Sequence, residues 1–278
     1  MEEVIPVSSA FALRHELNAR ARQLAIESGS AHDTTAAEFP SVIFSRTRNH
    51  EHGNFHPTSY RNICADPAWS RRLAKVHTSG PKTPSAPRRW RELDCAASSD
   101  ALLMNIFCYS RTLRNPALCA LLAISPGERP RFGYKPRVPL HDGQLDRTEI
   151  DMKLGSLLVE AKLTESGFQA APRRLVERYR HLLEVFDGRQ LPQIGTRLAG
   201  YQLLRGVLAA HASGGAFCVF CDARRPDLIE SWFSVLQAVR ICNLRCRLQL
   251  VTWQEISATL PRSLRVFLGK KYGIFPAP

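Results

Sequence analysis

The feature that most constrains the fold is the stretch TEIDMKLGSLLVEAKLTES, residues 148–166, in which apolar and polar side chains alternate around a Gly-Ser pair. Successive side chains of a strand point to opposite faces of a sheet, and a Gly-containing pair between two such runs is typical of a tight turn. The pattern therefore predicts a β-hairpin with its turn at Gly155 and Ser156.

The two faces of this hairpin differ in chemistry. Aliphatic side chains form one face, which must pack on a core: Ile150, Met152, Leu154, Leu157, Val159, Ala161 and Leu163. Charged side chains gather on the other: Glu149, Asp151, Lys153, Glu160 and Lys162. Exposed cross-strand ion pairs, worth under about 1 kcal/mol each, are one explanation. Because SLLVEA is typical of an interior strand, a divalent cation that offsets the repulsion between carboxylates is the other.

The remaining pattern predicts a mixed α/β fold. Apolar residues at helical spacing and capping residues predict helices over residues 9–27, 173–186, 196–211 and 226–242. They also predict a helix of about four turns that begins at Ser98. Short apolar runs predict further strands in RFGYKPRV, AFCVFCDA and CRLQLVTW, residues 131–138, 216–223 and 246–253. Because a helix separates the last two strands, we expect them to be parallel and buried.

Composition shifts suggest two domains. Residues 1–89 form an N-terminal accessory region, mainly helical, with a mobile linker at residues 28–40. It ends in the Pro-rich stretch 78–89. We expect residues 90–278 to form the main domain.

The charge balance indicates a polyanionic partner. The chain has a formal net charge of +13, and most of its 38 basic residues are Arg. Such a surplus favours nucleic acid, although an Arg-rich surface without a specific partner is the alternative. No apolar run approaches the roughly 20 residues that cross a bilayer, and the acidic start MEEVIPV is unlike a secretory signal. We therefore expect a cytoplasmic protein without a membrane partner.

Cysteines and histidines offer a zinc alternative. Cys218, Cys221, Cys242 and Cys246 have a spacing that resembles a four-thiolate site, but AFCVFC has no turn between its two cysteines. We interpret them as buried free thiols. The histidines of NHEHGNFH, at positions 50, 52 and 56, are expected to be surface residues.

The hairpin resembles a known nuclease signature. Asp151, eight intervening residues and then Glu160-Ala161-Lys162 are similar to the D…(D/E)-x-K motif of the PD-(D/E)XK nuclease superfamily, which has the restriction endonuclease-like fold. Asp151-Met152-Lys153 satisfies the (D/E)-x-K part too, but Asp142 or Asp146 would then be its first acid, too near for a strand, a turn and a strand. Glu160 and Lys162 also lie at the end of the more apolar strand, which favours them as the (D/E)-x-K pair.

The resemblance extends over residues 54–274 to the bacterial putative restriction endonucleases. It rests on NFHPTSY, SSDALLMNIF, YQLLRGVLAA, VTWQEI and FLGKKYGI, which begin at residues 54, 98, 201, 251 and 267. A helix before the hairpin and a helix and a strand after it match the superfamily's αβββαβ order. Two departures are Ile150 where the motif has Pro and Asp100 where Gln is expected.

The resemblance implies a restriction endonuclease-like mixed sheet flanked by helices and a Mg²⁺- or Mn²⁺-dependent DNA endonuclease. Asp151, Glu160 and the Ala161 carbonyl would hold the metal, and Lys162 would orient water or stabilise charge on the phosphate. Glu149 is a further possible ligand or a partner of Lys153, and Gln202 is either a group near the metal or a solvated residue.

Other functions stay open at this point. A DNA-binding protein on a nuclease fold without catalysis, a DNA repair or recombination nuclease and a zinc-containing regulator are the alternatives. A homodimer that cuts both strands is compatible with the resemblance. Candidate DNA contacts follow the proposed site or a parallel strand, although arginines on an exposed helix are also common as a solvated face: Arg173, Arg174, Arg178, Arg180, Arg224 and Arg225.

Overall fold

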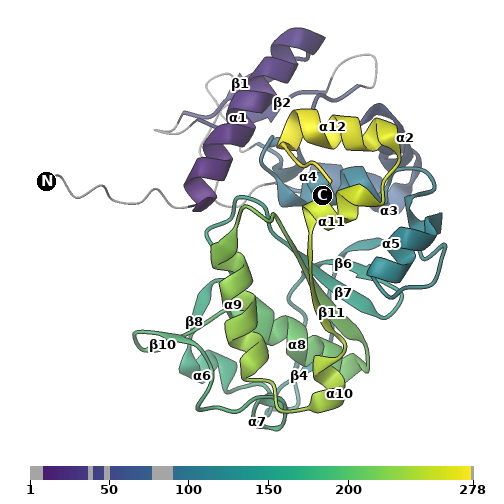
Figure 1. Ribbon diagram of the computed structural model, residues 1–278. Coiled ribbons are helices and arrows are strands. Elements are labelled where there is room, and N and C mark those ends of the chain that lie inside the picture. Colours follow the sequence, from purple (N-terminus) through teal and green to yellow (C-terminus); the bar gives the residue numbers. More distant parts are fainter. Residues whose placement is uncertain (1–8, 37–39, 47–50, 77–89, 277–278) are drawn as a thin grey trace, which may run out of the picture. The chain divides into compact units, whose positions relative to one another are not determined.

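The computed structural model describes residues 9–36, 40–46, 51–76 and 90–276 (Figure 1). The chain forms two compact units: unit 1 is Met1–Leu121 with Gln254–Pro278, and unit 2 is Leu122–Trp253. The proposed domain boundary in the Pro-rich stretch 78–89 lies outside the described residues. The division into domains at residues 89 and 90 therefore stays a prediction.

Unit 2 is built on a five-stranded sheet with the strand order β12-β11-β7-β6-β3. Its strands are β3 (Arg131–Tyr134), β6 (Ile150–Leu154), β7 (Leu157–Ala161), β11 (Ala216–Cys221) and β12 (Leu248–Thr252). β3, β6 and β7 pair antiparallel, whereas β11 is parallel to β7 and to β12. The predicted α/β class, the hairpin and the parallel last strands are confirmed.

Helix α8 (Tyr201–Ser213) is the crossover that allows β7 and β11 to run parallel. Its buried side chains join Leu158, Phe217 and other residues of the sheet in one hydrophobic cluster. Gly206 permits this close approach, because a Cβ at that position would lie 2.3 Å from Cζ of Phe217. The helix therefore covers the sheet face that carries Leu158.

Helix α9 (Pro226–Gln237) packs into the same cluster and ends earlier than predicted. Its buried residues Leu228, Trp232 and Val235 recur at helical spacing. The Trp232 ring lies 6.0 Å from the ring of Phe217, centroid to centroid. Helix α10 (Cys242–Arg245) then leads into β12.

The helix predicted over residues 173–186 is wrong. Two single turns, α6 (Arg173–Val176) and α7 (Leu182–Val185), replace it. The backbone between them is used elsewhere: the Arg178 carbonyl accepts from the amide of His141, and the amide of Arg180 donates to the Pro139 carbonyl, at 2.9 and 3.1 Å. These main-chain bonds to a distant segment compete with the helical ones.

Small sheets complete unit 2. Strand β10 (Arg197–Ala199) pairs with β8 (Ala170–Pro172) and β9 (Gln193–Ile194), so α8 begins after the predicted Thr196. Strands β4 (Val138–Pro139) and β5 (Leu145–Asp146) form a two-stranded ribbon. The backbone that precedes the β6–β7 hairpin is therefore held in place by short strand pairings.

Unit 1 is mainly helical. Its helices are α1 (Ser9–Ser28), α2 (Pro57–Ala65), α3 (Pro67–Ser70), α4 (Ser99–Phe107), α5 (Pro116–Leu121), α11 (Trp253–Ala258, beginning at the last residue of unit 2) and α12 (Arg262–Tyr272). Strands β1 (His32–Thr34) and β2 (Val42–Phe44) pair antiparallel, so the predicted linker at residues 28–40 contains a strand. Single 3-10 turns lie at Arg71–Ala74, Glu92–Asp94 and Thr112–Arg114.

Buried polar residues connect NFHPTSY with the segment that begins at Ser98. Asn105 of α4 accepts from the amide of His56 at 2.7 Å and donates to the carbonyl of Asn54 at 3.0 Å. Ser59 donates to the Asn105 carbonyl at 2.7 Å. The His56 ring also lies edge-on to Phe267 of α12, at 5.6 Å. Three of the stretches that carry the resemblance therefore meet in the core of unit 1.

Two expectations about side chains need correction. His52 and His56 were expected at the surface, but both are buried, His52 against Asp94 and His56 at the start of α2; position 50 lies outside the described residues. The eight cysteines are free thiols, and Cys218 and Cys221 are buried as predicted. Cys242 and Cys246 are instead exposed: Cys242 begins the short helix α10, and Cys246 follows that helix.

Within the described residues, no helix has the length and apolar character needed to span a bilayer.

Candidate active site

The carboxylates of the hairpin come together because of its register. Met152 pairs with Val159 and Lys153 with Leu158, so one further step places Asp151 opposite Glu160. Directly opposed residues of antiparallel strands point to the same face. The amide of Ala161 donates to Oδ2 of Asp151 at 2.7 Å, which anchors that carboxylate beside Glu160.

Glu160 is held between a cation and an amide. Nζ of Lys162 and Nε2 of Gln202 both donate to Oε1 of Glu160, at 2.8 and 2.7 Å. Glu160 and Lys162 are 2% and 5% exposed, and Asp151 is half-buried. Because both donors use Oε1, neither of them occupies Oε2.

The backbone of Lys162 is fixed on both sides. Its amide donates to the Phe220 carbonyl at 2.8 Å, and its carbonyl accepts from Nε1 of Trp253 at 2.9 Å. Trp253 is fully buried and lies edge-on to Phe220, with ring centroids 5.4 Å apart. The backbone of Lys162, the first residue after β7, is therefore held as firmly as that of a residue inside the sheet.

Lys162 is kept protonated. Burial by itself would lower the pKa of its ammonium, but the carboxylates of Glu160, Glu165 and Asp151 outweigh that effect and raise the pKa above its usual value. Its ammonium also lies over the Phe168 ring, 5.7 Å from the centroid. Lys162 can therefore act as a cation and hydrogen-bond donor at neutral pH but not as a base.

The donor set suits a hard divalent cation. Asp151 and Glu160 supply carboxylate oxygens, the ligand type that Mg²⁺ and Mn²⁺ prefer. Oε1 of Gln202 is buried and accepts no hydrogen bond within the described part of the chain. An unsatisfied buried acceptor is costly, and a cation or its water would satisfy it. On this ground the residues fit a metal.

Glu149 contributes its backbone to the fixed part of the site. Its carbonyl accepts from Nη2 of Arg205 at 3.0 Å, and its side chain is half-buried. Arg205 lies one helical turn after Gln202, so both point from α8 toward the hairpin. Sequence reasoning missed Arg205 and Trp253, although the three-residue spacing from Gln202 was a signal for the first.

Comparison with known families adds to this geometry. A family model described as restriction endonuclease associating with ARP matches residues 22–273. The chain belongs to this family. Its membership, together with the mixed sheet flanked by helices, confirms the expected restriction endonuclease-like relationship and fold and supports a nuclease-type role. No curated protein and no solved structure matches the chain.

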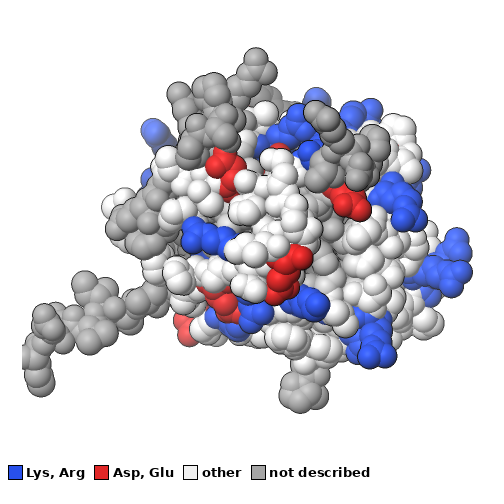
Figure 2. Space-filling model, turned by 90° about the horizontal axis from the view of Figure 1, so that it is seen from above, with Lys and Arg blue, Asp and Glu red and all other residues white. Residues whose placement is uncertain are grey.

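In this restriction endonuclease family member, the predicted phosphate contacts differ in exposure. Arg173, Arg174, Arg178 and Arg180 are exposed, and Arg173 pairs with Glu177 at 3.5 Å. Lys and Arg side chains also reach the surface at several places on the face seen in Figure 2, with Asp and Glu between them. The arginines around α6 are therefore available to a polyanion.

The two arginines after β11 have structural partners. Arg224 forms a forked pair with the buried Asp222, with nitrogen–oxygen distances of 2.8 and 2.7 Å, and is partly exposed. Arg225 is fully buried and donates to the carbonyls of Leu163 and Glu165 at 2.9 and 2.8 Å. Arg225 therefore ties the loop after β11 to the loop after β7, and as a DNA contact it is withdrawn.

A second group of side chains could hold a metal. The potential ligand atoms of His181, Glu184 and His211 lie within 4.8 Å of one another. The two imidazoles are 2.7 and 3.2 Å from different oxygens of Glu184. Two nitrogens and a carboxylate suit zinc better than Mg²⁺. Both carboxylate oxygens of Glu184 thus already lie within hydrogen-bond distance of an imidazole.

Proposed function

We propose that this restriction endonuclease family member is a Mg²⁺- or Mn²⁺-dependent DNA endonuclease that hydrolyses phosphodiester bonds at the end of the β6–β7 hairpin. The observation that carries the proposal is the arrangement around Glu160. A buried carboxylate lies opposite Asp151 and receives hydrogen bonds from Lys162 and Gln202, at 2.8 and 2.7 Å. Families of this type usually use divalent metals, and the oxygen ligands agree with that.

The residues would divide the work as follows. Asp151, Glu160 and the Ala161 carbonyl would hold the metal ion. When bound, such an ion lowers the pKa of water and neutralises charge on the phosphate. Gln202 keeps the Glu160 carboxylate in place and offers its own Oε1 to the ion or to water.

Lys162 supplies positive charge at a fixed position. Because its pKa is raised, Nζ keeps its protons at neutral pH and donates hydrogen bonds. Hydrogen bonds to Phe220 and Trp253 fix the backbone of Lys162, which would help to position this group to stabilise negative charge on the phosphate. Lys153, the competing lysine of the motif, instead lies over the Tyr134 ring at 4.7 Å.

The substrate is proposed to be DNA, contacted through the exposed arginines 173, 174 and 178 with Arg224 as a partly exposed neighbour. Counterion release from the phosphates would supply most of the sequence-independent affinity. Glu149 is retained as a possible outer ligand through its side chain. A homodimer that presents two such sites, and a cytoplasmic location, stay predictions.

The test is nicking or linearisation of supercoiled plasmid with and without Mg²⁺. Wild-type chain is expected to cut only with the metal, and Asp151→Asn, Glu160→Gln and Lys162→Met are each expected to lose at least about 100-fold in rate. Arg189→Gln, an exposed residue away from the hairpin, is the matched control and should cut like wild type. Equal cutting by wild type and the hairpin variants would reject the assigned site, and DNA binding without cutting would favour a non-catalytic binding protein.

A further inference from the structure

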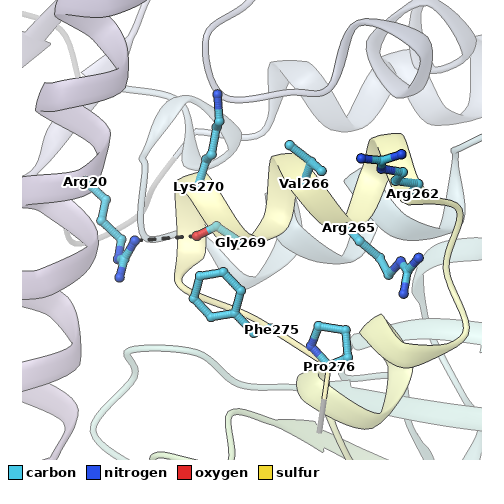
Figure 3. Close-up of a pocket in the computed structure, with 8 residues that line it drawn as sticks. All are labelled: Arg20, Arg262, Arg265, Val266, Gly269, Lys270, Phe275 and Pro276. Atoms are coloured by element: carbon cyan, nitrogen blue, oxygen red, sulfur yellow. Dashed lines mark hydrogen bonds between the residues drawn. The ribbon is translucent and has the colours of Figure 1, made fainter. Parts of the chain in front are cut away.

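Unit 1 contains a basic hollow of about 520 Å³ along helix α12 (Figure 3). Three arginines and a lysine line it, and its remaining lining has no carboxylate among the described residues: Arg20, Arg262, Arg265 and Lys270. This size lies within the range of small-ligand sites. The hollow therefore offers positive charge in a space that fits about one nucleotide.

Helix α12 presents this lining on one face. Arg262, Val266 and Gly269 recur three or four residues apart, and Arg265 adjoins them. The opposite face carries the buried Leu264, Leu268 and Tyr272. A basic helix face is often only solvated, but on this one Val266 is 50% exposed and the Phe275 ring lies against Gly269.

Phe275 is the side chain that points to a ligand. It is 58% exposed although it follows a buried Ile274. Its ring rests on the bare backbone of Gly269, where a Cβ would lie 2.8 Å from Cε1 of Phe275. The glycine therefore makes room for a ring that is held against the helix and yet remains open to a partner.

Arg20 closes the other side of the hollow. Its Nε pairs with Glu16 at 2.7 Å, and Nη1 donates to the Gly269 carbonyl at 3.5 Å. Figure 3 shows Arg20 and Arg265 on the two sides of the Phe275 ring. Charge and an exposed ring are thus combined in one place.

We propose that this hollow binds a single-stranded nucleic-acid segment, with a base stacked on Phe275 and the adjoining phosphates held by Arg262, Arg265 and Lys270. Base stacking on an aromatic ring between cations is the general mode of single-strand binding. An acidic peptide would satisfy the cations but would leave Phe275 without a flat partner. The proposal rests on the proposed function only for the class of polymer, because it concerns a separate contact in unit 1.

Fluorescence anisotropy with a short labelled oligothymidine tests it, in metal-free buffer and on the full chain carrying Asp151→Asn, so that the probe is not cut. Phe275→Leu is expected to weaken binding about tenfold, in line with the loss of one stacked base. Arg265→Gln is expected to reduce the slope of log affinity against log salt by about 0.7. Phe233→Leu, which alters an aromatic side chain of similar exposure (51%) on α9, should bind like the parent.

Unchanged affinity in Phe275→Leu, or no binding by the parent, would overturn the proposal. Displacement of the probe by polyglutamate that itself binds in a Phe275-dependent manner would assign the hollow to an acidic peptide. The plasmid assay reports on phosphodiester cutting at the hairpin site and not on oligothymidine binding. If plasmid stays uncut while oligothymidine binding depends on Phe275, the proposed nuclease function fails and this inference stands.

Discussion

Glu160 and Lys162 form an ion pair that is almost removed from water, with side-chain exposures of 3% and 7%. Removing both charges from water costs free energy, and their mutual attraction roughly offsets that cost only while both charges are present. The pair is therefore weak as a stabilising device. Its position next to Asp151 and Gln202 agrees with the proposed catalytic role.

This reasoning predicts an asymmetry in stability. Lys162→Met is expected to lower the unfolding free energy by about 3–5 kcal/mol, because a buried carboxylate loses its cation. The double change Glu160→Leu/Lys162→Met is expected to be about as stable as wild type, since both buried charges are removed. Urea denaturation followed by tryptophan fluorescence measures both, and equal losses in the single and double variants would contradict the prediction.

Lys271 is a second buried cation, with a different consequence. It is fully enclosed in unit 1, its Nζ has no hydrogen-bond partner within the described residues, and it lies 4.5 Å from the centroid of the Phe44 ring. Burial lowers the pKa of Lys271 to about 7. The faces of the aromatic rings favour the charged form of Lys271, but they do not restore its pKa to the ordinary value.

The lowered pKa predicts a pH dependence of stability. Between pH 7 and pH 10.5 the unfolded chain binds a proton at Lys271 that the folded chain does not, so the contribution of Lys271 to the unfolding free energy rises with pH across this window and is constant on either side of it. Lys271→Met should remove that rise and stabilise the protein most at and below pH 7. Denaturation of both proteins at several pH values measures the difference, with the exposed Lys270→Met as control. A constant difference between Lys271→Met and wild type would refute the assignment.

At the scale of elements, α8 is the helix on which the site depends. It covers β7 and β11 and delivers Gln202 to Glu160 from its first turn. The contact of Gly206 with the Phe217 ring sets the distance between α8 and the sheet. A displacement of this helix would therefore move Gln202 as well as loosen the core.

Gly206→Ala is expected to destabilise the protein by about 1–3 kcal/mol, because the added methyl group overlaps the Phe217 ring and this outweighs the gain of roughly 1 kcal/mol in helix propensity. Thermal or urea denaturation measures the effect. Ala212→Ser, at an exposed position of the same helix, is the control and should stay within about 0.5 kcal/mol. A Gly206→Ala protein as stable as wild type would mean that α8 can shift without cost.

The elements also show where prediction from sequence stops. The helix over 9–27 and the strand in AFCVFCDA were predicted correctly because their patterns are local. The segment 173–186 was predicted wrongly because the backbone at Arg178 and Arg180 bonds to residues 141 and 139. The helical spacing of side chains does not reveal that the main chain forms hydrogen bonds to a distant segment in place of helical ones.

At the scale of the whole molecule, the net charge of +13 becomes a prediction about binding. Affinity of the metal-free Asp151→Asn protein for duplex DNA should fall linearly on a log–log plot against salt, as counterions are released. Replacing Arg173, Arg174 and Arg178 by Gln should reduce the slope by about 2 to 3. Arg189→Gln should leave the slope nearly unchanged. An unaltered slope in the triple variant would show that these arginines do not meet phosphates.

Arg225 illustrates why charge in a sequence is not the same as charge on a surface. It adjoins Arg224 in the sequence, yet it is fully buried and bonded to two carbonyls of the loop after β7. Composition counts both arginines alike. Only packing separates a residue that holds two loops together from one that a phosphate can reach.

The sequence by itself determined the hairpin, its turn and the face that Asp151 and Glu160 share, because side-chain direction in a strand follows from position alone. Only the tertiary structure decided that Gln202 would bond Glu160, that Trp253 would hold the Lys162 carbonyl and that Arg225 would be buried. Those contacts join residues 42, 91 and 62 positions apart in the chain. They depend on how α8 and the parallel strands pack, which no local pattern specifies.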